Sequence, residues 1–501
     1  MNLFKFINSS QVKSFCILFS ILLFHLFCIN FYPVNDEFIF PVGAKLIESL
    51  NINVINNFFD YNANTLGFSI TIFFLSKIFP FDYYTIGKLL SSSGLILIYV
   101  GTFNLLKIIN FNSIKNKHIL ILLILLNPLI FTFSFRSTPD FFSTALAFFS
   151  VTCFIINKNF FLKLFLLIIF SFAVIIKPHC AIIILLIFAD LDQKFYYSKK
   201  NIVLFLWFLL SLTIPLLYFI LNFNLFNFFI IPEQLKSRMI FKFEIKFFII
   251  KILSYIGFLN LFIITLYLDY FITSLKKNPL RLGFYFLIST LISFFFMQDV
   301  GELNFGFINN YLNSYFFYFL LSLSFFIFCD YFLYLIKKKG INKYILCSFC
   351  LTIIFLIFLC YLQPSQRYLL PIIPILLVSF FLINKIMFLN ILTIIIYLTM
   401  NIPLFLNHYY TSKNIENVLV YLQQNNIIKD THPGAAGQHA LNYFIDFEKD
   451  TKNFMNENIL FSEKKKYFIT DKEPLNKDDI IFISKSNNIF KKNKNLYLLK
   501  K

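Results

Sequence analysis

Apolar runs of about twenty residues recur along most of this chain, and they constrain its fold more than any other feature. Hydrophobic residues fill 58% of the 501 positions, and charged residues fill only 14%. No soluble domain buries that much apolar surface. Within lipid the backbone polar groups must bond to one another, so the spans should be helices. The sequence therefore predicts an all-α polytopic membrane protein.

The formal net charge of +19 does not indicate a nucleic-acid partner. The excess Lys lies in short connections between apolar runs and in the C-terminal part, with no basic stripe or reading motif. The eight Cys lie in or beside apolar runs, so we expect no disulfide framework. Membrane lipid is the partner that the composition predicts.

The first apolar run, 14–32, fixes the expected orientation. Lys5 and Lys13 precede it and should remain in the cytoplasm. The loop 34–87 then lies outside, with interfacial helices at 38–50 and 66–79. The run 66–79, at about 14 residues, is short for a span. We expect it to lie flat, because Lys107, Lys115 and Lys117 then stay inside.

Charge also places twelve later spans, which together with the first make about thirteen. The expected limits are 88–107, 118–135, 139–156, 161–176, 178–191, 201–222, 247–271, 282–298, 311–335, 344–362, 368–384 and 386–406. Lys and Arg then gather in the inner connections, as the positive-inside rule requires. Residues 1–406 form the transmembrane domain of a bacterial inner or plasma membrane protein.

An odd number of spans places the C-terminus outside. Residues 407–501 are charged and rich in Asn, and their apolar runs are short. We expect a helix at 414–425 and strands at 480–484 and 496–499. The sequence thus predicts a small C-terminal α/β extramembrane domain on the periplasmic or extracellular face.

Ionisable residues that interrupt the apolar sequence gather at the expected outer ends of the spans, where such groups are usually functional. They are Asp36, Glu37, Arg136, Asp140, Lys177 and Arg367. Carboxylates paired with cations suit transfer from a phosphate leaving group. The acid takes a proton from the acceptor hydroxyl or holds a divalent metal, and the cations stabilise the departing phosphate.

A structural interpretation of the same residues stays open. Asp36 and Glu37 follow a span directly, as charges do wherever a span meets water. Arg136 and Arg367 present forks that bind phosphate, but Arg also snorkels to the interface without a ligand. We expect His179 to be a polar packing residue.

Three motifs resemble the C-type (GT-C) superfamily of integral-membrane glycosyltransferases. Asn35-Asp36-Glu37 lies where the family has its first acidic motif, and Arg136-Ser137-Thr138-Pro139-Asp140 is similar to the second. The segment 172–178 resembles the family's Lys-containing turn, and Gln366-Arg367-Tyr368-Leu369-Leu370-Pro371 is a weaker match. In layout the aminoarabinose and protein O-mannosyl transferases are closest. Their Lys/His-Pro-Pro segment is replaced here by residues 62–66.

The resemblance implies an inverting transfer from a polyprenyl-phosphate sugar to an acceptor hydroxyl at the outer face. The acceptors in the superfamily are glycolipid, polysaccharide and protein. The resemblance makes Asp36 the catalytic base or a metal-associated acid, Asp140 a second catalytic or metal acid, and Glu37 their support. The resemblance also makes Lys177 a phosphate contact and Arg136 a supporting residue. The guanidinium groups at span ends separately predict that Arg136 and Arg367 bind the donor phosphate with Lys177. The metal would be Mg or Mn.

Two other functions remain. An O-antigen polymerase or ligase also uses outer-loop Arg, but in a large late loop, whereas the loops 298–310 and 363–367 are short. A transporter or flippase typically has internal repeats and helices interrupted by Gly or Pro. The chain shows no convincing repeat, and Gly occurs only 12 times.

Overall fold

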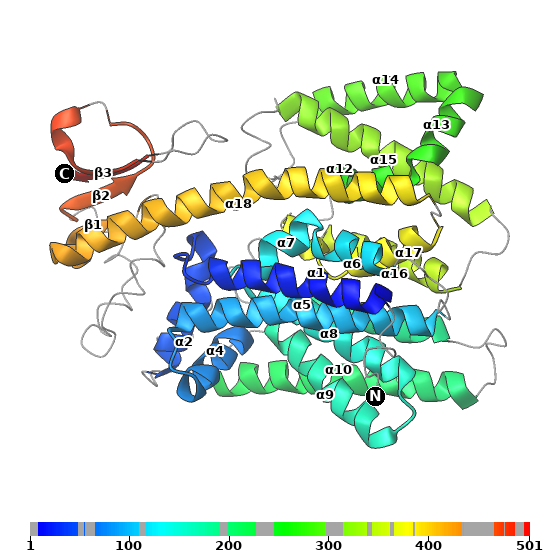
Figure 1. The fold of residues 1–501 in the computed structure, drawn as a ribbon, viewed down its shortest axis with the longest axis horizontal. Coiled ribbons are helices and arrows are strands. Elements are labelled where there is room, and N and C mark those ends of the chain that lie inside the picture. The colour runs from blue at the N-terminus through cyan, green and yellow to red at the C-terminus, as the bar shows by residue number, and fades with distance from the viewer. Residues whose placement is uncertain are drawn as a thin grey trace.

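The computed structural model is a bundle of helices that lie side by side along its long axis, with a small sheet at one end (Figure 1). It describes residues 9–48, 55, 66–109, 117–190, 199–226, 245–296, 314–337, 343–360, 365–383, 386–432, 434, 465–474, 476–485 and 495–500.

Among these residues, six helices are long and apolar enough to cross a membrane, or seven if one bent pair counts as a single span. The predicted class, an all-α polytopic membrane protein, is confirmed at this level.

The chain enters through α1 (Ser9–Cys28) and then forms three short elements, η2 (Asn35–Phe38), α2 (Ile39–Glu48) and α4 (Gly67–Ile78). Helix α2 packs against α4 and is buried on all sides from Ile39 to Ala44, and only Glu48 at its end is exposed. Lys77 Nζ and the Tyr83 hydroxyl each donate to the Glu48 carboxylate at 2.5 Å. Helices thus occur in the two segments expected to be interfacial.

Glycines bring α5 (Tyr83–Ile108) close to α8 (Pro139–Ile156). Gly87, Gly94 and Gly101 are spaced by seven residues, which returns to one helix face. A Cβ at Gly94 would lie 2.8 Å from the Phe141 ring, and one at Gly101 would lie 2.7 Å from the Phe148 ring. Small residues permit such close helix packing within lipid.

Two predicted spans are not regular α-helices. The span expected at 118–135 is broken into α6 (Lys117–Leu125) and α7 (Pro128–Ser134), bent by 63°. Pro128 cannot continue α6, and Asn127 accepts a hydrogen bond from Leu129 N to start α7. The segment 178–190 is a 3₁₀ helix, η3 (Pro178–Asp190). Its larger rise per residue lets this short segment cover about 26 Å.

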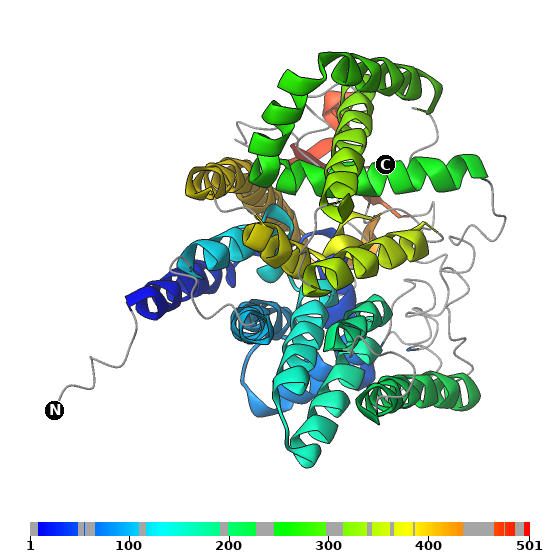
Figure 2. The ribbon, with the colours of Figure 1, turned by 90° about the vertical axis from the view of Figure 1, so that its right-hand side faces the viewer.

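The remaining helices follow the predicted segments closely. They are α9 (Phe160–Ile176), α10 (Lys199–Phe226), α12 (Ile245–Ile263), η4 (Ile264–Tyr267), α13 (Leu268–Lys277), α14 (Pro279–Phe296), α15 (Ser314–Lys337), α16 (Lys343–Leu359), η6 (Gln366–Leu369) and α17 (Ile373–Ile383). Figure 2 views the bundle from its end. Helices α16 and α17 lie between the group α12–α15 and the group α5, α8, α9 and η3.

The last predicted span and the predicted helix at 414–425 form one helix, α18 (Met387–Gln424). The expected domain boundary at residue 407 therefore falls inside a helix. Residues 407–413 contain neither Gly nor Pro, and His408 and Ser412 are buried against the bundle, so nothing ends the helix there.

A four-stranded sheet follows α18, in the order β1-β2-β4-β3. It comprises β1 (Thr431–His432), β2 (Tyr467–Thr470), β3 (Ile480–Ser484) and β4 (Leu496–Lys500), with 3₁₀ turns η7 (Ile428–Asp430) and η9 (Lys477–Asp479). Strand β1 is parallel to β2, and β4 is antiparallel to β2 and β3. The strands predicted at 480–484 and 496–499 are present.

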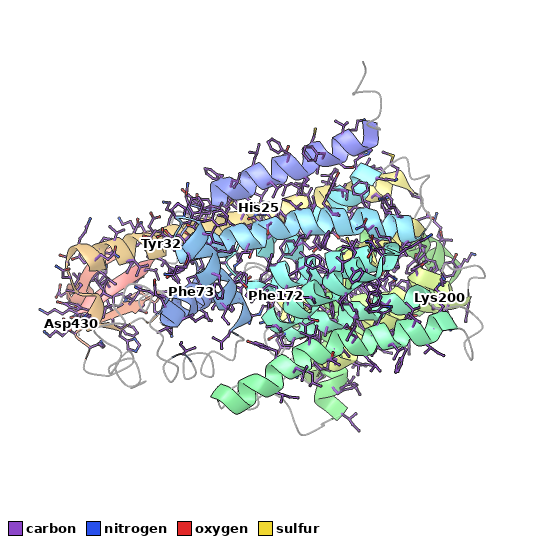
Figure 3. All side chains as sticks on the ribbon, turned by 90° about the horizontal axis from the view of Figure 1, so that it is seen from below. His25, Tyr32, Phe73, Phe172, Lys200 and Asp430 are labelled. Carbon is purple, nitrogen blue, oxygen red and sulfur yellow. The ribbon has the colours of Figure 1, made fainter. Side chains whose placement is uncertain are left out.

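The sheet packs on the segment that follows α1. Val34 and Phe38 share a buried cluster with Val418 and Leu422 of α18 and with Leu498 of β4. In Figure 3, Tyr32 and Asp430 lie towards one end of the molecule, and Lys200 lies at the other. The first loop and the C-terminal part therefore share one end, which we call the outer end after the sequence-based topology.

Candidate functional site

Five predicted site residues meet at the outer end, although they come from segments far apart in the sequence. They form two ion networks. The Glu37 network comprises Glu37, Arg136, His408 and Lys88. The Asp140 network comprises Asp140, Lys177, Arg367 and His179. The segment 136–140 joins the two networks, because it supplies Arg136 to one and Asp140 to the other.

The start of α8 places Asp140. Thr138 is the extended residue before the helix, Pro139 occupies its first turn, and Asp140 follows in that same turn. Pro is favoured there because the first helical N–H has no partner within the helix, and its φ suits a helix start. A carboxylate in the first turn is stabilised by the positive end of the helix dipole. The local sequence therefore accounts for a buried acid at this point.

Glu37 is held by direct contacts. Arg136 Nε donates to Glu37 Oε1 at 2.7 Å, and His408 Nδ1 lies 3.7 Å from the same oxygen. The Glu37 side chain is completely buried, whereas that of Arg136 is 20% exposed. Since charge-assisted bonds of this length are strong, Glu37 cross-links η2 to the start of α8 and to α18.

The Glu37 carboxyl favours its ionised form. Burial alone raises its pKa, but protonated His408, Arg136 and Lys88, with the hydrogen bond from Arg136, outweigh burial and leave the pKa below its usual value. Burial lowers the pKa of His408 itself to about 4, so at neutral pH Arg136 is the charged group in direct contact with Glu37. Glu37 therefore acts as a fixed negative charge at neutral pH, paired with Arg136.

Asp140 is held more loosely. Lys177 Nζ lies 3.6 Å from Asp140 Oδ1, and Arg367 Nε lies 4.0 Å from the same oxygen. The Asp140 side chain is only 1% exposed. Within the described residues, neither carboxylate oxygen accepts a hydrogen bond of normal geometry. Lys177 ends α9 and Arg367 belongs to η6, so three separate segments form this network.

Other buried polar atoms belong to residues that precede Asp140 in the chain or to its network. Among the described residues, the hydroxyls of Ser137 and Thr138 and the Nε2 atom of His179 have no hydrogen-bond partner. The His179 ring packs against Tyr368, with 5.3 Å between ring centroids, so the predicted packing role fits. Buried polar atoms are normally paired, so this concentration marks a place where a polar ligand can bind.

A metal ion does not fit this arrangement. Within the described part of the chain, no group of three or more His, Cys, Asp or Glu side chains is arranged to hold one. The groups nearest to Asp140 include two cations, which would repel Mg²⁺ or Mn²⁺. Asp36, the other predicted metal ligand, has its backbone in η2, but its side chain lies outside the described part.

The sequence-based prediction missed two members of the Glu37 network. His408 lies just after the expected outer end of the last span. The predicted site residues also lie at the outer ends of spans, so the same criterion would have selected His408. Lys88 is the first residue of the span expected at 88–107. A Lys at a span end usually extends into water, yet this side chain is only 1% exposed. No pattern in the sequence shows that the Lys88 side chain turns inward.

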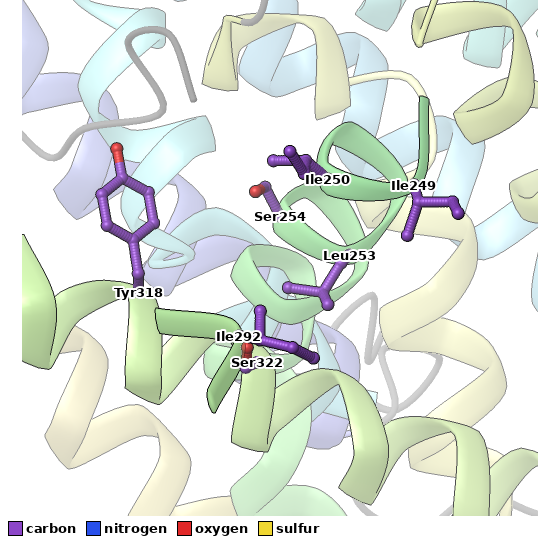
Figure 4. A pocket seen from close by; sticks show the side chains of 7 residues that line it. All are labelled: Ile249, Ile250, Leu253, Ser254, Ile292, Tyr318 and Ser322. Atoms are coloured by element: carbon purple, nitrogen blue, oxygen red, sulfur yellow. The ribbon is translucent and has the colours of Figure 1, made fainter. Parts of the chain in front are cut away.

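A small apolar groove, with a cavity volume of about 40 Å³, lies between α12, α14 and α15 and is partly open to the surroundings. Its lining, drawn in Figure 4, is Ile249, Ile250, Leu253, Ser254, Ile292, Tyr318 and Ser322. No charged side chain lines it, so the groove suits an apolar group. It adjoins the Arg367 segment through α12, because the Tyr255 hydroxyl accepts a hydrogen bond from Ser365 N at 3.1 Å.

A comparison of the chain with protein-family models, curated proteins and solved structures finds no match.

Proposed function

We propose that this protein is an inverting glycosyltransferase that moves a sugar from a polyprenyl-phosphate donor to an acceptor hydroxyl at the outer membrane face. The observation that carries the proposal is the Asp140 network. Within the described part of the chain, a buried acid whose oxygens accept no hydrogen bond of normal geometry lies within 4.0 Å of two cations, at one end of an apolar helical bundle. This site combines a proton acceptor with a phosphate-binding pair.

Each component has a chemical role. A carboxylate, Asp36 or Asp140, takes the proton of the acceptor hydroxyl as its oxygen attacks the anomeric carbon. The bond from that carbon to the phosphate oxygen breaks, and polyprenyl phosphate leaves. Lys177 and Arg367 stabilise the charge on the leaving phosphate. Arg136 was expected to bind phosphate too, but its ion pair with Glu37 supports a positioning role for both residues.

The topology that fits this chemistry has about thirteen spans. The bent pair and the shorter apolar helices, α4 excepted, would supply the spans beyond the six long ones. The N-terminus would be cytoplasmic, and the C-terminal domain periplasmic or extracellular, in a bacterial inner or plasma membrane. The groove between α12, α14 and α15 suits the apolar chain of a lipid-linked donor. The acceptor would be a glycolipid, a polysaccharide or a protein.

The experiment is to incubate the purified protein with a panel of polyprenyl-phosphate sugars and a membrane extract as the source of acceptors, and to measure released polyprenyl phosphate. Asp36→Asn should abolish release, with a loss of at least about 100-fold, while the protein still inserts and accumulates. Asp82→Asn is the control, because Asp82 is an exposed acid beside the start of α5. Retained activity in Asp36→Asn would overturn the proposed function.

A transporter is the second candidate, because the break between α6 and α7 and the 3₁₀ segment η3 resemble the interrupted helices of transporters. Labelling from each side of the membrane separates the two functions. An enzyme with one site should expose Asp140, Lys177 and Arg367 to reagents from the outer side only. Reactivity from both sides, without any release of polyprenyl phosphate, would favour transport.

A further inference from the structure

Two buried lysines reach from one helix to the C-terminal end of another. Lys88 of α5 is 1% exposed, and Lys251 of α12 is 6% exposed. The first contacts the end of α1, and the second contacts the end of α16. Each of those ends leads directly into a segment of the candidate site.

Lys88 binds the last carbonyl group of α1 and two carbonyl groups of the turn that follows it. Its Nζ donates to the carbonyl oxygens of Cys28 at 3.4 Å and Ile29 at 3.5 Å, and it also donates to that of Phe31. From there the chain runs only as far as η2 before it reaches Glu37. The position of Lys88 therefore fixes where the Glu37 segment begins.

Lys251 makes the corresponding contact at α16. Its Nζ donates to the Cys360 carbonyl at 3.1 Å, next to the last residue of that helix. One turn further along α12, the Tyr255 hydroxyl accepts a hydrogen bond from Ser365 N, at the start of η6. Arg367 lies within η6. Helix α12 thus holds the chain on both sides of 361–364, just before Arg367.

Helix C-termini need such partners. The last carbonyls of a helix have no partner within it, and the helix dipole makes that end negative. Water normally satisfies these carbonyls, but a buried lysine replaces water and adds a favourable charge. Because the side chain comes from a different helix, the bond also fixes the end of one helix against another.

We propose that Lys88 and Lys251 are positioning residues that cap α1 and α16 and thereby hold the segments carrying Glu37 and Arg367. The link to catalysis rests on the function proposed above. The two lysine–carbonyl contacts, which we call the Lys88 clamp and the Lys251 clamp, can be tested without it. The reason is that each lysine has a carbonyl acceptor that belongs to a buried cysteine, Cys28 for Lys88 and Cys360 for Lys251. Each thiol therefore reports on its own clamp.

The experiment measures the rate at which N-ethylmaleimide labels each cysteine of the full-length protein in detergent, resolved by peptide mass spectrometry. Lys88→Met keeps the length of the side chain and removes its ammonium group. It should raise the labelling rate of Cys28 roughly tenfold and leave Cys360 unchanged, because only the local contact opens. Lys251→Met should do the reverse. Cys16, which is exposed, monitors the reagent.

The two variants control each other. Equal acceleration at Cys28 and Cys360 in either variant would mean general loosening and would overturn the proposal, as would unchanged labelling in both. Lys88→Arg keeps the donors and should label like the unmodified protein. If Lys88→Met does not accumulate, Lys88→Gln replaces it. The labelling of Cys360 in Lys251→Met tests the Lys251 clamp independently.

A second readout is the release of polyprenyl phosphate from polyprenyl-phosphate sugars. Both Met variants should lower kcat with little change in KM, and Lys88→Arg should restore it. Opened clamps with unchanged kcat would overturn the positioning role. If the unmodified protein releases no lipid phosphate, the proposed function fails, whereas the labelling result still stands.

Discussion

The two ion networks at the outer end hold their acids in different ways. Glu37 accepts a 2.7 Å hydrogen bond from Arg136, whereas the nearest cation to Asp140 is 3.6 Å away. Both acids are buried, yet only Glu37 has an oxygen with a hydrogen-bond donor among the described residues. A tightly paired acid has little freedom to accept a proton. The difference indicates that Glu37 shapes the site and that Asp140 is available to a ligand.

Asp140→Asn gives the largest expected effect. Asn has nearly the same shape but cannot take a proton, so release of polyprenyl phosphate should fall by at least about 100-fold. Among the described residues neither Asp140 carboxylate oxygen accepts a hydrogen bond of normal geometry, and its cations lie 3.6 and 4.0 Å away, so the melting temperature in detergent should fall less than in Glu37→Gln. Activity assays and a melting curve check both points.

Asp330→Asn is the matched control. Asp330 is another acid paired with an arginine, Arg281, but it lies on α15 in the predicted inner half of the bundle. It should leave activity intact. A large loss of stability in Asp140→Asn would instead place Asp140 with Glu37 as a structural acid.

Glu37→Gln should mainly cost stability. It leaves the Arg136 charge in a largely buried place without its partner, which typically costs about 3 kcal/mol or more. Denaturant unfolding in detergent measures this. Adding Arg136→Gln should recover part of the loss, because the stranded charge is then removed as well.

Glu48→Gln is the comparison for this prediction. The Glu48–Lys77 pair is about half exposed and should contribute less than about 1 kcal/mol. If Glu37→Gln costs no more than Glu48→Gln, Glu37 is not the structural link between η2 and α8.

Gly87→Ala tests the segment that joins the two networks and should have the smallest effect. A Cβ there would lie 2.0 Å from Ser137 Oγ, so the buried Ser137 side chain must move, at a cost of about 1 to 2 kcal/mol. Gly283→Ala is the control, because a Cβ at Gly283 meets no atom within 4 Å. Melting curves of both variants should show a loss for Gly87→Ala alone.

The helices were predictable because most of them coincide with apolar runs that can be read from the sequence. The span expected at 139–156 matches α8 at both ends, since Pro139 starts it and Asn157 follows it. The break at Pro128 was missed, because hydropathy continues through residues 118–135 and only local backbone geometry divides them. The domain boundary expected at 407 lies within α18. Composition changes there, but nothing stops the helix.

The site was predicted only in part. Asp140, Lys177 and Arg367 stood out because each interrupts apolar sequence at a span end, and the structure brings them together. The roles within the Glu37 network were not readable. Lys88 and Arg136 both look like charges at the edge of a span, and only the direction of each side chain separates a helix cap from an ion-pair partner.

The sequence by itself determined that this chain is a helical membrane protein, because hydrophobic length and charge are local properties that lipid selects directly. It also determined which ionisable residues lie at span ends. Only the tertiary structure decided which of them meet, since Glu37 and Arg136 are 99 residues apart and contact each other only when α1, α8 and α18 pack. Pairing between distant segments depends on that packing, and packing leaves no periodic signal in a single sequence.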